Sequence, residues 1–102
     1  MKQKIIEETS RYRSEPAFKL GTIVMTLGAS EALSNQDILE AIVRHERCDW
    51  GDVSSQDWEG NDDALVSSGR ILSSYQSRKG VEFWIITEWD RSNTTVLMPE
   101  EY

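Results

Sequence analysis

Residues 81–88, VEFWIITE, decide the fold class, because the middle of this run is apolar on both faces of an extended chain. Such a strand is expected inside a sheet with a helix over one side. Residues 70–76 and 94–98 are also strand-like, and residues 77–80 and 89–93 between the runs have turn compositions. Consecutive strands joined by such turns predict a three-stranded antiparallel meander.

The first half of the chain adds one strand and one main helix. Residues 22–26 are β-branched or apolar, which predicts a buried strand. Ser30 is predicted to cap a short turn, and Ser34 to cap a helix that ends near residue 46, with Asp37 at its third position. The predicted buried face of that helix consists of Ile38, Leu39, Ile42, Val43 and His45.

These elements predict an α+β fold. Its antiparallel sheet contains the C-terminal meander and an N-terminal strand, and it packs with one main helix and with a short helix in a long acidic loop. The chain has 102 residues, enough for one hydrophobic core. We expect residues 18–102 to form a single domain and residues 1–17 to be a flexible or loosely docked tail. A lone cysteine and the lack of a long apolar run favour the cytoplasm.

The loop from residue 48 to residue 69 carries six acidic residues and no Lys or Arg. Its composition predicts an irregular segment with a short helix capped by Asn61. The whole chain has 11 basic and 18 acidic residues and a net charge of −7, which disfavours binding to nucleic acid. A solvated acidic loop is one interpretation. The other is a surface that binds a basic partner, with these contact residues: Asp57, Trp58, Glu59, Asp62 and Asp63.

A second candidate site lies at the end of the main helix. His45, Asp49 and Asp52 offer ligand atoms that zinc accepts, and Cys48 lies between them. The spacing lacks the paired Cys or His residues that are typical of structural zinc sites. The alternative is a core histidine that is hydrogen-bonded to Asp49.

A hydrolase is the alternative function. His45 or Glu88 would act as general base, and Arg70 and Arg91 would stabilise the phosphorane. The order of residues 70–72, 84–87, 90–91 and 94–95 on a meander resembles that of the barnase-like ribonucleases. In the competing interpretation the two arginines pair with nearby acids at the ends of the sheet.

From about residue 18 to residue 102 the chain resembles a family of small plasmid-related proteins of mobile elements, some of which are labelled as associated with type I restriction systems. The segments that carry the resemblance are residues 18–24, 44–45, 49–52, 69–75, 84–88 and 99–102. The family usually has Gly where Cys48 stands. The resemblance implies a mobile element, a bacterial cytoplasm and a contest with host defence, but no established activity.

Charge and resemblance together predict a non-enzymatic protein that binds and inhibits a host defence nuclease, of the anti-CRISPR or anti-restriction type. The expected partner surface is a basic one that normally binds nucleic acid. Neither nucleic acid nor a membrane is an expected partner. A small metal-dependent or barnase-like nuclease or toxin, with zinc as its possible cofactor, is the alternative, and a toxin or antitoxin partner is a third hypothesis.

Overall fold

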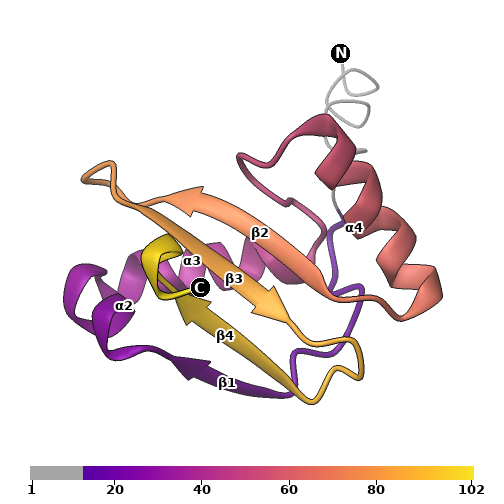
Figure 1. Cartoon of the computed structure of the whole chain (residues 1–102), viewed down its shortest axis with the longest axis horizontal. Coiled ribbons are helices and arrows are strands. Elements are labelled where there is room, and N and C mark those ends of the chain that lie inside the picture. Colours follow the sequence, from indigo (N-terminus) through magenta and orange to yellow (C-terminus); the bar gives the residue numbers. More distant parts are fainter. Residues whose placement is uncertain (1–12) are drawn as a thin grey trace.

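The computed structural model describes residues 13–102 as an α+β fold in which helices pack on a four-stranded sheet (Figure 1). The strand order is β1-β4-β3-β2, so β1 and β2 are the edges. Along the chain the elements are β1 (Thr22–Met25), α2 (Leu27–Ala32), α3 (Asn35–Glu46), α4 (Ser55–Ser67), β2 (Ile71–Gln76), β3 (Glu82–Thr87), β4 (Asn93–Leu97) and the 3₁₀ helix η1 (Pro99–Glu101).

The structure confirms the C-terminal meander. β2 pairs antiparallel with β3, with Ile71 opposite Thr87, and β3 pairs antiparallel with β4, with Trp84 opposite Leu97. β3 is an inner strand, as its two apolar faces predicted. Ile85, at its middle, is fully buried.

The N-terminal strand differs from the prediction in two respects. β1 pairs with β4 in the parallel sense, with Thr22 opposite Asn93, so the sheet is mixed rather than antiparallel. A parallel neighbour needs a long crossover connection, and here α2, α3, α4, β2 and β3 all lie between the two strands. β1 is also not buried, because Ile23, Val24 and Met25 are each between 43% and 45% exposed.

The structure confirms both predicted ends of the main helix. The Ser34 side chain accepts a hydrogen bond from the Asp37 amide, and the helix ends at Glu46. Its buried face is rotated from the predicted one: Ile38, Ala41, Ile42 and His45 are buried, whereas Leu39 and Val43 are exposed. These buried positions follow the i, i+3, i+4, i+7 spacing of a single helical stripe.

Two helical segments in the first two thirds of the chain begin at other residues than predicted. The short helix before α3 is capped by Thr26, not by Ser30. The acidic loop is largely a 13-residue helix, α4, whose N-cap is Ser54 rather than Asn61. The cap hydroxyl of Ser54 accepts from the Asp57 amide at 3.0 Å, the same arrangement that begins α3.

The core has two parts. One cluster joins α3 to the sheet through Ile38, Ile42, Phe83 and Ile85. The other lies under α4 and contains Cys48, Trp50, Ala64 and Ile71, with Phe18, Val53, Trp58 and Leu65 packed against it. α4 is therefore docked on the β2 edge of the sheet (Figure 1).

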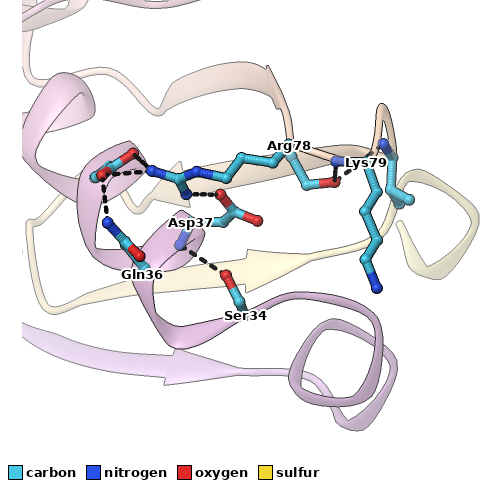
Figure 2. A network of polar contacts seen from close by, with 8 residues as sticks. Ser34, Gln36, Asp37, Arg78 and Lys79 are labelled. Carbon is cyan, nitrogen blue, oxygen red and sulfur yellow. Dashed lines mark hydrogen bonds and ion pairs between the residues drawn. The ribbon is translucent and has the colours of Figure 1, made fainter.

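Polar contacts hold the β2–β3 turn to the start of α3. Figure 2 shows the Arg78 guanidinium from this turn beside the carboxylate of Asp37. The same guanidinium lies 2.9 Å from Glu40 Oε2. Gln36 contacts Glu40, and Ser34 caps the same helix end. One arginine thus joins the hairpin to the first turns of the helix.

Of the predicted tail, residues 1–12 lie outside the described part of the chain. Residues 13–17 run along the end of α3, where the Arg13 amide donates to the Arg47 carbonyl at 2.6 Å. The Ala17 amide donates to the Glu46 carbonyl at 2.8 Å. These bonds direct the chain from the end of α3 towards β1.

Candidate functional site

The predicted zinc ligand His45 lies in the core. Its side chain is fully buried, and Phe18 and Trp50 contact the ring edge-on with centroid distances of 5.4 and 5.8 Å. Nδ1 lies 2.6 Å from Ser73 Oγ on β2, and Nε2 lies 2.9 Å from Thr87 Oγ1 on β3. Both ring nitrogens are therefore occupied by hydroxyl groups.

The hydroxyl chain beyond His45 fixes the tautomer of the ring. Thr94 Oγ1 donates to the Leu20 carbonyl at 2.7 Å, and a carbonyl can only accept. The Thr94 hydroxyl has a single proton, and that proton is used in this bond. The Thr87 hydroxyl, whose oxygen lies 2.7 Å from Thr94 Oγ1, must therefore donate to Thr94. Thr87 then accepts from His45 Nε2–H, and His45 Nδ1 accepts from Ser73.

This arrangement holds the imidazole neutral. Burial, followed by the positive charge of Arg91, lowers the pKa of His45 to about 3. The ring joins α3 directly to β2 and β3, and the Thr87 hydroxyl extends this connection to Thr94 on β4. It therefore acts as a structural core histidine.

The other two predicted zinc ligands do not meet His45. Asp49 accepts from Arg44 Nε at 2.7 Å, and Arg44 lies over the Tyr75 ring. Asp52 is exposed, and its amide donates to the Ser74 carbonyl. Within residues 13–102 no group of three His, Cys, Asp or Glu side chains is arranged to hold a metal ion. The alternative of a core histidine is right about burial but wrong about its partner, which is not Asp49.

The predicted partner-binding residues all lie on α4, but they point in three different directions. With about 100° per residue, Glu59, Asp62 and Asp63 project from the outer side of the helix, around the 90% exposed Val66. We call these four residues the acidic face. Asp57 points to the side of α4 that faces β2, and Trp58 is half-buried against the core cluster below the helix.

Two contacts fix the orientation of α4. Asp62 accepts a hydrogen bond from Trp50 Nε1 at 3.0 Å. The buried Asn61 amide donates to the Leu72 carbonyl at 2.8 Å and accepts from the Leu72 amide at 3.2 Å, so it pairs with the edge of β2 as a neighbouring strand would. The sequence offered Asn61 only as a helix cap, and its true role depends on a strand 11 residues away.

The acidic face keeps its charge because no base neutralises it within the described chain. The four ion pairs of residues 13–102 use Arg44, Arg70 and Arg78, and none of them reaches Glu59, Asp62 or Asp63. The partner of Asp62 is the indole of Trp50, which carries no charge. The face is therefore a source of negative potential on a rigid helix.

The residues expected for a hydrolase are not assembled around one cleft. His45 is inaccessible, and Arg91 donates to the carbonyls of Gly69, Glu88 and Ala64, where it ties the end of α4 to the β3–β4 turn. The competing interpretation had expected Arg91 to pair with an acid, whereas its hydrogen-bond partners in the described chain are carbonyl groups.

Arg70 pairs with Glu88 at 3.6 Å and donates to the Tyr102 hydroxyl at 2.9 Å. It also borders an open cavity of about 330 Å³ together with Asp57, Gly60, Asn61 and Leu72. Glu88, the other predicted base, thus lies beside Arg70, but the second predicted arginine, Arg91, is occupied by main-chain carbonyls.

Searches of family models, of curated proteins and of solved structures find no match to this chain. The resemblance to a plasmid-related family therefore stays a prediction. In the described residues no helix is long and apolar enough to cross a membrane.

Proposed function

We propose that this chain is a cytoplasmic binding protein, not an enzyme, and that it inhibits a host defence nuclease by placing the acidic face of α4 on a basic nucleic-acid-binding surface. The observation that carries the proposal is the set of acidic side chains on α4 that no base of the described chain neutralises. The defence setting comes from the resemblance to mobile-element proteins. A net charge of −7 supports a basic partner over nucleic acid itself.

The helix suits this role because, within the described chain, Asp62 is the only residue of the acidic face with a contact that docks α4, through Trp50. Glu59 and Asp63 take no part in the docking contacts described above. Asn61 and Ala64 point to β2 and into the core, whereas Glu59 and Asp63 point away from them. A rigid helix loses little conformational entropy on binding, so more of the electrostatic attraction remains as affinity. Val66 adds an exposed apolar contact at the centre of the charged surface.

Charge reversal on the acidic face tests the proposal. Purified full-length chain is titrated into DNA cleavage by RNA-guided and restriction nucleases at low and at moderate salt. We expect inhibition that weakens as salt rises, and a loss of potency of at least roughly tenfold for the double variant Glu59→Lys with Asp63→Lys. The matched control is Glu15→Lys with Glu100→Lys, which changes the net charge equally at two other exposed acids.

The control and a direct binding assay separate the explanations. If both double variants lose potency equally, the effect is one of net charge and α4 is not the contact surface. If wild type binds the nucleic acid itself, the competition mechanism is wrong. Turnover of labelled RNA or DNA by wild type, with or without a chelator, would favour the nuclease alternative.

A further inference from the structure

The two edge strands of the sheet, β2 and β1, differ in the hydrogen bonds of their outward backbone groups. On β2 the outward backbone groups of Leu72 pair with Asn61, and those of Ser74 pair with the Trp50 carbonyl and the Asp52 amide. On β1, Thr22 and Thr26 donate towards β4, so Ile23 and Met25 direct their backbone groups outward by alternation. No residue from 13 to 102 pairs with these outward groups.

The side chains of β1 are as open as its backbone. Ile23 and Met25 lie in register with Thr94 and Val96 on the helix-covered face of the sheet, and they are nevertheless 45% and 43% exposed. The reason is the position of the helices, since α3 packs against β3 and α2 against β4. Natural edge strands usually carry Lys, Pro or a bulge that prevents pairing, and β1 has none of these.

The exposed flank of α3 extends this apolar surface. Asp37 and Arg44 lie on the flank of α3 that faces β2, through contacts to Arg78 and to Tyr75. Leu39 and Val43 lie on the opposite flank, towards β1, and both are exposed. Exposed apolar groups from a strand and from the adjacent helix together mark an interaction surface rather than scattered surface residues.

We propose that β1 is a dimerisation edge, at which β1 of one copy pairs antiparallel with β1 of a second copy to join the two sheets into one. A two-fold axis at Val24 places Ile23 of each copy opposite Met25 of the other. Such an edge is complementary to itself, as a symmetric interface requires. The two α3 flanks then face each other across the axis on the same side of the joined sheet.

Charge favours a second copy as the occupant. The whole chain carries −7, yet residues 20–30 contain no charged side chain, so two copies can meet here without direct repulsion. Lys19 lies before the start of β1, whereas Glu101 lies at its end, where it accepts from the Thr26 hydroxyl. Antiparallel pairing brings Lys19 of each copy towards the end that carries Glu101 of the other.

Sedimentation of the full chain over a range of concentrations tests the proposal. We expect a dimer with a dissociation constant of roughly 1 to 100 μM, because a short strand pair gives an interface at the small end of the range. Val24→Lys places two ammonium groups opposite each other at the axis and should raise that constant at least roughly tenfold. Gln56→Lys, which adds the same charge at an exposed position of α4 outside both proposed surfaces, should leave it unchanged.

Amide hydrogen exchange of Ile23 and Met25 gives a readout that does not depend on a variant folding well. In the dimer these two amides donate to the partner strand, so their protection should rise with protein concentration. A chain that stays monomeric at about 500 μM, or a dimer whose two amides exchange rapidly, overturns the proposal. Protection that is independent of concentration would mean that another segment of the same chain covers the edge, which also overturns it.

Discussion

Acidification from pH 7 to pH 5 should destabilise this protein through His45 alone. The ring is buried and neutral, with Nε2–H donating to Thr87 and Nδ1 accepting from Ser73. Below pH 6.5 the unfolded chain binds a proton on this histidine, whereas the folded chain does not until about pH 3. Because the unfolded state binds more protons in that window, the stability falls as the pH falls.

The magnitude follows from the two pKa values. Each pH unit below 6.5 costs roughly 1.4 kcal/mol, so the free energy of unfolding should be roughly 2 kcal/mol lower at pH 5 than at pH 7. The lowered carboxyl pKa values of Asp90 and Glu101 do not interfere. Their contribution is present above the ordinary carboxyl range of roughly 4 and is lost only at lower pH.

Urea unfolding at pH 7 and at pH 5 measures this difference, with His45→Gln as the matched variant. Glutamine has no titrating group, so the variant should be less stable than wild type at pH 7 but should change by less than about 0.5 kcal/mol between the two pH values. The variant thus separates the loss of hydrogen bonds from the loss of the proton linkage.

Proton NMR provides a direct test, because the chain has one histidine. The imidazole resonance of the folded protein should not shift between pH 8 and pH 5. A titration with a midpoint near 6.5 in the folded state would refute the neutral, buried ring and the assigned tautomer. Equal pH dependence for wild type and His45→Gln would refute the linkage.

Two further predictions concern positions where local geometry dictates the residue. Cys48 has a φ of 69°, so Cys48→Gly should change stability by less than about 1 kcal/mol, as relief of backbone strain offsets the lost packing, whereas Cys48→Val should cost at least about 2 kcal/mol in chemical denaturation. Asn61→Ala leaves both backbone groups of Leu72 without their partner and should cost about 1 to 3 kcal/mol, with faster exchange of the Leu72 amide. Unchanged exchange at Leu72 would contradict the edge-pairing role of Asn61.

The parts of the fold that the sequence predicted well are those with local signals. The meander follows from three strand-like runs joined by two short turns, and such neighbours pair without any long-range information. The ends of α3 follow from the cap at Ser34 and the charges near it. The side of α3 that is buried was less predictable, since Leu39 and Val43 are as apolar as the residues that face the sheet.

A helix was predicted within the acidic loop, but α4 begins earlier and is longer than predicted, although its start signal was present. Ser54 and Asp57 have the same spacing as Ser34 and Asp37, which were recognised. Gly60 and the many Asp and Ser residues lowered the expected helix propensity. Tertiary contacts compensate, because Asn61 bonds to β2 and Trp50 bonds to Asp62.

The partners of His45 could not be predicted from sequence neighbours. Ser73 and Thr87 lie 28 and 42 residues further along the chain, and only the sheet register brings them to one ring. Asp49 was the more obvious partner because it is near in sequence, but Arg44 binds it instead. The closeness of His45 and Asp49 along the chain therefore suggested a metal site. In the fold His45 packs in the core and Asp49 forms an ion pair with Arg44.

The partners of the arginine residues determine which acidic side chains have an ion pair. Arg44 and Arg78 pair with acids around α3, Arg70 pairs with Glu88, and Arg91 binds carbonyl groups. α4 is held instead by an amide and an indole, which carry no charge. If α4 were anchored through arginine pairs to Asp62 or Asp63, its field would be cancelled. Neutral anchoring leaves the carboxylates of the acidic face without an ion pair in the described chain, and this is the physical basis for expecting a basic partner there.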